Sequence, residues 1–87
     1  ESGQIIDSLG WVYYKMGEIE KAVVELERAI KYMPNDSVVF EHLGDVYLKK
    51  GLKGKAVEFY EKAVRLDAKN EKLKGKLDEL KKNGNEE

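Results

Sequence analysis

The stretch LGWVYYKMG at residues 9–17 recurs as LGDVYLKKG at residues 43–51, 34 positions later. The repetition extends in both directions, because residues 3–36 align with residues 37–70 without a gap and are identical at 11 of 34 positions. Most of the identical positions hold small or apolar residues, which indicates conserved packing between the two copies. A repeat of this length is typical of a stacked array of small units rather than of one closed core.

Apolar residues recur at helical spacing in five segments that short helix-stopping signals separate. We expect helices over the residue ranges 4–16, 19–33, 37–50, 54–67 and 71–82. Gly17 and Gly51 can adopt the positive φ that ends a helix. Pro34 cannot continue the second helix, and Asp36 can cap the third. Because the connections are only two or three residues long, consecutive helices should be antiparallel neighbours.

Each expected helix of the two copies carries one apolar stripe that we expect to be buried. The stripes are Ile6, Leu9, Tyr13 and Met16; Ala22, Val23, Leu26, Ala29 and Ile30; Phe40, Leu43 and Tyr47; and Ala56, Val57, Tyr60, Ala63 and Val64. Gly10 and Gly44 lie inside helices, where glycine costs about 1 kcal/mol relative to alanine. Their recurrence beside alanines predicts that paired helix backbones approach closely, with Tyr13 and Tyr47 filling the wedge between neighbouring hairpins.

Taken together, these spaced residues resemble the tetratricopeptide repeat. The first copy supplies Ile6, Leu9, Gly10, Tyr13, Gly17, Ala22, Leu26, Ala29 and Pro34, and the second supplies Phe40, Leu43, Gly44, Tyr47, Gly51, Ala56, Tyr60 and Ala63. The resemblance implies an all-α, right-handed superhelical array of helical hairpins, most similar to bacterial multi-repeat proteins. Residues 1–87 then form one domain, divided into a first repeat at 3–36, a second at 37–70, a capping helix at 71–82 and a disordered tail at 83–87.

Three positions depart from the family pattern. Ala68 replaces the proline, so the break after the fourth helix should be weaker and depend on Asn70 as a cap for the fifth. Where the family has an aromatic residue early in the second helix of a repeat, the first copy has Ile19 and the second has Lys53, with Leu52 and Gly54 beside it. We therefore expect the second turn to be reshaped or more mobile than the first.

The two ends of the expected array differ. The capping helix carries Leu73, Leu77 and Leu80 on one otherwise polar helix, which is how terminal repeats keep an array soluble. The first helix has no helix ahead of it to cover Ile5 and Val12. This leaves an alternative open, in which the chain is a structural or self-associating excerpt of a longer array that forms a homodimer through its first helix.

Composition argues against several classes of function. The 87-residue chain is 41% apolar and 38% charged, has a net charge of -1, and contains no cysteine for disulfides or thiolate metal sites. No run approaches the roughly 18 apolar residues that span a bilayer, so we expect a soluble chain without a membrane partner and favour the cytoplasm. Lysines cluster in residues 49–55 and 69–76, but interleaved acids favour local pairing over nucleic-acid binding.

The sequence offers little for catalysis or cofactor binding. The single histidine, His42, has Glu41 beside it and Asp45 one turn on, which would suit a general base oriented by a carboxylate. We favour an exposed polar residue on an interaction helix, because no nucleophile motif or phosphate-binding loop accompanies it. Asp7, Glu41 and Asp45 could converge on a hard cation, but acids opposite lysines are usually solvated. We therefore expect neither an enzyme nor a bound metal or cofactor.

The expected binding surface is the inner side of the first helix of each repeat. The candidate residues are Asp7, Trp11, Tyr14 and Lys15 in the first copy, and Glu41, Asp45, Leu48 and Lys49 in the second. The family resemblance implies that these positions line a concave groove for a peptide or partner segment, as in a protein-interaction scaffold or adaptor. Trp11 could instead pack against a preceding repeat.

The charge of this surface also indicates what it would bind. Family members that grip a C-terminal carboxylate carry lysine, asparagine and arginine in the groove, whereas the corresponding positions here are Asp7, Trp11 and His42. This departure disfavours an acidic peptide tail. We expect instead a protein partner with basic and apolar side chains.

Overall fold

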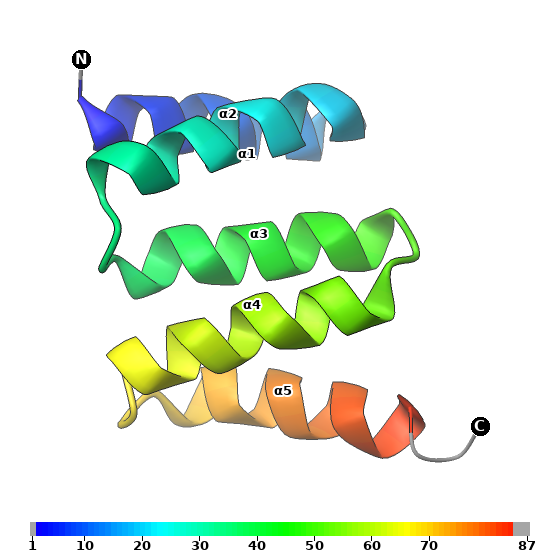
Figure 1. Ribbon diagram of the computed structural model, residues 1–87. Helices are drawn as coiled ribbons and strands as arrows, with labels where there is room; N and C mark the ends of the chain where they lie inside the picture. The colour runs from blue at the N-terminus through cyan, green and yellow to red at the C-terminus, as the bar shows by residue number, and fades with distance from the viewer. Residues whose placement is uncertain (1, 85–87) are drawn as a thin grey trace.

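A computed structural model describes residues 2–84, with side chains described through residue 82. Five helices follow one another: α1 (Gly3–Lys15), α2 (Ile19–Tyr32), α3 (Ser37–Lys49), α4 (Lys53–Leu66) and α5 (Glu71–Gly84). They stack from the α1–α2 pair at one end to α5 at the other (Figure 1). The predicted all-α array of two hairpins and a fifth helix is confirmed, with ends shifted by one or two residues. Residues 83 and 84 belong to α5 rather than to the predicted tail, and the rest of that tail, 85–87, lies outside the described residues.

The turns inside the two hairpins have the same geometry. Gly17 has φ +83° and Gly51 has φ +86°, as predicted for residues that end a helix. In the first turn the N–H of Glu18 donates to the carbonyl of Tyr13 at 2.8 Å, and in the second the N–H of Leu52 donates to Tyr47 at 3.0 Å. The prediction that the second turn is reshaped is therefore wrong, because the backbone hydrogen bonds that close the turn do not need the missing aromatic residue.

Polar side chains begin the helices that follow the longer connections. Asp36 Oδ1 accepts hydrogen bonds from the backbone N–H groups of Val38 at 2.9 Å and Val39 at 3.3 Å. Asn70 Oδ1 accepts one from Leu73 at 3.0 Å. Both predicted caps are confirmed, and α4 ends at Leu66 even though alanine replaces the family's proline.

Two of the glycines inside helices, Gly10 and Gly44, make room for large side chains. A Cβ atom on Gly10 would lie 2.7 Å from Cγ of Leu26, and one on Gly44 would lie 2.6 Å from Cδ1 and Cε1 of Tyr60. The predicted close approach of two helix backbones is supported only at Gly10, where a Cβ would also lie 3.4 Å from the backbone N of Leu26. The neighbours are mainly side chains of the partner helix rather than its backbone.

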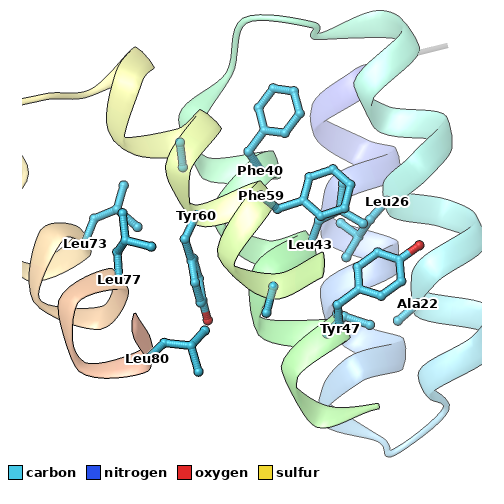
Figure 2. Close-up of a cluster of buried hydrophobic side chains, with 13 residues drawn as sticks. Ala22, Leu26, Phe40, Leu43, Tyr47, Phe59, Tyr60, Leu73, Leu77 and Leu80 are labelled. Atoms are coloured by element: carbon cyan, nitrogen blue, oxygen red, sulfur yellow. The ribbon is translucent and has the colours of Figure 1, made fainter. Parts of the chain in front are cut away.

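The second tyrosine of the repeat fills the predicted wedge, and the first does not. Tyr47 is buried, its ring stacks on Phe59 with centroids 5.4 Å apart, and its hydroxyl donates to Glu27 Oε2 of α2 at 3.0 Å (Figure 2). Burial and this hydrogen bond raise the pKa of Tyr47 to about 12. Tyr13 is only partly buried: α2 lies on one side of it, with Lys21 Nζ 5.7 Å from the ring centroid, but no described helix covers its other side as α2 covers Tyr47.

Three positions of the repeat are buried in α3 and α5 but exposed in α1. Val39, Leu43 and Val46 of α3 are fully buried, and their equivalents Leu73, Leu77 and Leu80 of α5 are at most 8% exposed. Figure 2 shows the three leucines of α5 facing Tyr60 of α4. The equivalents in α1 are Ile5, Leu9 and Val12, which are 70%, 40% and 51% exposed.

The buried stripe predicted for α1 is therefore partly wrong. Leu9 and Met16 are exposed, and Ile6 of that stripe is buried. The reason is that Leu9 and Met16 point to the side of α1 where no helix covers them. The exposure predicted for Ile5 and Val12 is confirmed.

Candidate functional site

Side chains of α1, α3 and α5 meet on one face of the array, which we call the α1–α3–α5 face. Its contacts join each of these helices to the next one of the set: α1 to α3, and α3 to α5. Consecutive first helices of the repeats therefore touch each other through polar and aromatic side chains rather than through the apolar core.

An acid–imidazole pair links α1 to α3. His42 Nδ1 lies 2.8 Å from Asp7 Oδ1, and both side chains are mostly buried, at 18% and 14% exposed. An ionised carboxylate only accepts, so this contact is a hydrogen bond in the His42 tautomer that carries a proton on Nδ1. The interpretation of His42 as an exposed residue is thus wrong, and its carboxylate neighbour is Asp7 from the other repeat rather than Asp45.

An aromatic stack covers this pair. The rings of Trp11 and His42 have centroids 4.1 Å apart with an interplanar angle of 19°, and Trp11 also stacks on Tyr14 at 4.7 Å. Lys15 Nζ lies 5.3 Å from the Trp11 ring centroid, within the range of a cation–π contact. Trp11 therefore packs toward the following repeat.

A lysine links α3 to α5. Lys76 Nζ donates to Glu41 Oε2 at 2.7 Å and to Asp45 Oδ1 at 3.1 Å, while the Tyr60 hydroxyl donates a short hydrogen bond to the same Asp45 oxygen. Burial alone lowers the pKa of Lys76, but the two carboxylates outweigh it and the pKa is raised. Burial and the hydrogen bond to Asp45 also raise the pKa of Tyr60.

The two links occupy the same position of the repeat. His42 and Lys76 are 34 residues apart, and each reaches back 35 residues to an acid on the preceding first helix, Asp7 or Glu41. Equivalent positions of the repeat therefore make equivalent contacts between α1 and α3 and between α3 and α5. Asp7 and Glu41 are held by these contacts and do not project freely into solvent.

A pocket of about 290 Å³ opens between α3 and α5. It is lined by Asp45, Leu48, Tyr60, Lys76, Glu79 and Leu80. Leu48 is 40% exposed and Glu79 is exposed, so both are accessible to a ligand at the pocket. The lining combines an apolar floor with carboxylates.

The structure brings seven of the eight predicted site residues into these contacts. Asp7, Trp11, Tyr14 and Lys15 form the aromatic end, Glu41 and Asp45 bind Lys76, and Leu48 lines the pocket, whereas Lys49 is exposed at the end of α3 without joining either group. Sequence reasoning placed His42 at a groove position but missed its contact with Asp7, and it did not name Tyr60 or Lys76 as members of the face. The 34-residue spacing of His42 and Lys76 was a usable signal for Lys76.

The acidic side chains of the face are engaged with bases of this chain. Within the described residues, no three histidine, aspartate or glutamate side chains gather as a metal site would require. Several of the clustered lysines also have acidic partners, including Lys50 with Glu20 at 3.0 Å and Lys74 with Glu71 at 3.6 Å. None of the five described helices combines the length and apolar character that crossing a bilayer requires.

Known families match most of the chain. The family described as TPR repeat matches residues 10–51, and the family described as tetratricopeptide repeat matches residues 39–70. The chain belongs to the tetratricopeptide repeat family. Proteins of this family generally mediate protein–protein interactions and are typically not enzymes.

Similar proteins come from eukaryotes and bacteria. Anaphase-promoting complex subunit 3 of Schizosaccharomyces pombe is 37% identical over 62 residues, which is 71% of this chain but only 9% of that protein. The chain thus spans less than a tenth of this relative's length. The match to a eukaryotic protein leaves the bacterial resemblance unsupported as an assignment of source.

Two solved structures share the fold. The structure of Pseudomonas aeruginosa pilF superposes with a TM-score of 0.89 at 26% identity, over 98% of this chain and 39% of that chain. The second TPR of Spaghetti (RPAP3), bound to the HSP90 peptide SRMEEVD, superposes with a TM-score of 0.81 at 22% identity, over 94% of this chain and 85% of that one.

Proposed function

We propose that the chain is a protein-interaction module whose α1–α3–α5 face binds a partner segment carrying apolar and basic side chains. The observation that carries this proposal is the arrangement of two neighbouring features on one face. The Trp11 stack lies at the α1 end, and the pocket with Asp45 and Glu79 lies at the α5 end.

The aromatic end supplies contact area at a low entropic cost. The Trp11 ring is held by stacking on Tyr14 and His42 and remains only partly buried. Aromatic side chains that are fixed before binding lose little conformational freedom, and tryptophan is enriched among the residues that dominate binding energy. An apolar side chain of the partner would pack here.

The pocket end favours a positive charge. Glu41 and Asp45 bind the ammonium of Lys76, and Glu79 lines the same pocket as Asp45 and Lys76. These four residues together carry three carboxylates and one ammonium, which is an excess of negative charge. A lysine or arginine of the partner can lay its aliphatic stem along Leu48 and reach Glu79 with its charged head. The same excess would repel an acidic segment.

The basic segment that we propose for this face is opposite in charge to the peptide bound in the RPAP3 structure. The peptide SRMEEVD ends in acidic residues. That relative is 22% identical and supports only the fold here, so its ligand serves as a contrast rather than as a candidate. We expect the face to discriminate between basic and acidic peptides because of its carboxylates.

The proposal is tested with two matched peptides that alternate leucine or phenylalanine with either arginine or glutamate. Titration into ¹⁵N-labelled protein should shift the Trp11 indole resonance and the amides around Asp45 with the basic peptide and much less with the acidic one. Trp11→Ala should weaken binding by about tenfold. Tyr32→Ala, which removes an exposed aromatic ring from α2, is the control. Shifts confined to α2 and α4 would refute the proposal.

A further inference from the structure

A second pocket, of about 260 Å³, opens where the α2–α3 connection passes the C-terminal end of α4; we call it the α4 pocket. It is lined by Pro34, Asn35, Phe40, Lys62, Arg65 and Leu66. These residues come from both repeats, so the pocket lies within the array and not at either end of the chain. None of them belongs to the α1–α3–α5 face, so a ligand in the α4 pocket is independent of the proposed function.

The lining of the α4 pocket carries positive charge. It contains Lys62 and Arg65 and no acidic residue, whereas the pocket between α3 and α5 contains two carboxylates. The acids next to the lining residues in the sequence are engaged in caps and turns. Asp36 Oδ1 accepts a hydrogen bond from the backbone at the start of α3, and Asp67 Oδ2 accepts one from Asn70 Nδ2 at 3.2 Å. An anionic ligand would therefore be attracted to this pocket.

Arg65 is available to bind a carboxylate. Glu61 stands four residues before it on α4, which is the usual spacing for a local ion pair. Glu61 Oε2 instead pairs with Lys81 Nζ of α5 at 3.1 Å. Arg65 is exposed, and no acidic side chain of the described residues forms an ion pair with it. Its planar guanidinium can donate two parallel hydrogen bonds to one carboxylate.

Lys62 contacts aromatic rings rather than a carboxylate. Its Nζ lies 5.8 Å from the ring centroid of Phe40 and 5.4 Å from that of Phe59, and the two rings are stacked with centroids 6.1 Å apart (Figure 2). In the first repeat the equivalents of Lys62 and Phe59 are Arg28 and Glu25, which form an ion pair at 2.6 Å. Because a phenylalanine replaces that glutamate in the second repeat, the charge of Lys62 is not neutralised by its own helix. The ring contacts also restrict its side chain, which lowers the entropic cost of binding an anion.

The pocket also has an apolar side, and its size limits what it can hold. Leu66 is 42% exposed, Pro34 is exposed, and Phe40 contributes an aromatic ring. The volume of about 260 Å³ lies below the roughly 300–1,000 Å³ of small-molecule sites. The pocket therefore suits one or two side chains of a peptide, one apolar and one anionic.

We propose that the α4 pocket binds a short segment of a partner protein in which a glutamate or aspartate stands next to a leucine or phenylalanine. The apolar side chain packs on Pro34, Phe40 and Leu66. The carboxylate accepts hydrogen bonds from the guanidinium of Arg65 and the ammonium of Lys62. This charge preference is the reverse of the one proposed for the α1–α3–α5 face, so the two sites select different segments.

Three short peptides with blocked ends test the proposal by alternating leucine with glutamate, serine with glutamate, and leucine with glutamine. In titrations of ¹⁵N-labelled protein, only the leucine–glutamate peptide should saturably shift the amides of Asn35 and Leu66 and the side-chain Nε–H of Arg65. Arg65→Gln should weaken its binding by about tenfold, as should Lys62→Gln. Lys49→Gln removes the same charge from an exposed site at the other end of α3 and should leave binding unchanged.

Each of four results would overturn the proposal. Two are the absence of saturable shifts at the α4 pocket and equal binding by Arg65→Gln and Lys49→Gln. The third is equal binding of the serine–glutamate peptide, because charge alone would then explain the shifts. The fourth is tighter binding of a thymidine oligonucleotide than of the leucine–glutamate peptide at low salt through the same residues, which would assign the pocket to nucleic acid. The resonances followed here differ from those of the α1–α3–α5 face, so failure at this pocket leaves the proposed function standing.

Discussion

Replacing Gly44 by alanine gives the sharpest test of the packing between α3 and α4. The new Cβ would lie 2.6 Å from two ring atoms of Tyr60 and 3.0 Å from a third, well inside ordinary van der Waals contact. The ring cannot easily withdraw. It is 2% exposed, its hydroxyl is bonded to Asp45, and leucines of α5 pack against its other side (Figure 2).

The expected magnitude combines two opposing effects. Overpacking a core typically costs about 1–3 kcal/mol. Alanine in place of glycine inside a helix gains about 1 kcal/mol. The net effect of Gly44→Ala should therefore be a loss of about 1 kcal/mol in the free energy of unfolding, or about 4–8 °C in Tm for a domain of this size.

Gly75 provides the matched control. It also lies inside a helix, α5, but a Cβ atom added there meets no atom within 4 Å. Gly75→Ala should therefore stabilise the fold by about 0.5–1 kcal/mol. The two substitutions are chemically identical, so any difference between them comes from the tertiary neighbours.

Urea and thermal unfolding followed by circular dichroism measure both variants. The expected difference between them is about 2 kcal/mol with opposite signs. Amide exchange in α5 should also accelerate in Gly44→Ala, because displacement of Tyr60 loosens the surface on which α5 packs. If Gly44→Ala is as stabilising as Gly75→Ala, the reasoning from the Tyr60 contact is wrong.

Three further predictions address the cap, the tyrosines and the lysine link. Asn70→Ala should lower the free energy of unfolding by about 1 kcal/mol through loss of the α5 cap, whereas Lys69→Ala should have little effect in the same urea titration. The free energy of unfolding should fall as pH rises above 10, because the pKa of Tyr47 is raised from 10.0 to about 12 in the folded chain and the unfolded chain therefore loses the tyrosine proton first. Tyr47→Phe should make this decline with pH less steep. An unchanged slope in Tyr47→Phe would contradict the assignment to Tyr47. Lys76→Met should lower the free energy of unfolding by about 1 kcal/mol, a small value because a third of the lysine side chain is exposed and its charge is screened by solvent. Adding Glu41→Gln to Lys76→Met should recover part of this loss, because it removes a carboxylate that has lost its cation.

The elements that depend on local chemistry can be predicted from the sequence alone. The positive φ at Gly17, the cap at Asp36 and the leucine stripe of α5 follow from signals contained within one turn or one helix. The match between residues 3–36 and 37–70 then predicted how these elements repeat. Backbone preferences and helical spacing act over a few residues, so they can be read without knowing the neighbours.

The contacts of each repeated position, in contrast, depend on how the helices pack in the folded array. Leu9 and Leu43 are the same residue at the same repeat position, yet one is exposed and the other buried, because α2 covers α3 and no described helix covers α1. The α1–α3–α5 face likewise depends on the contact of His42 with Asp7 and of Lys76 with Glu41, each across 35 residues. Whether a side chain is buried or bonded depends on both of the helix surfaces that meet in the folded chain. A repeat pattern in the sequence describes only the surface to which that side chain belongs.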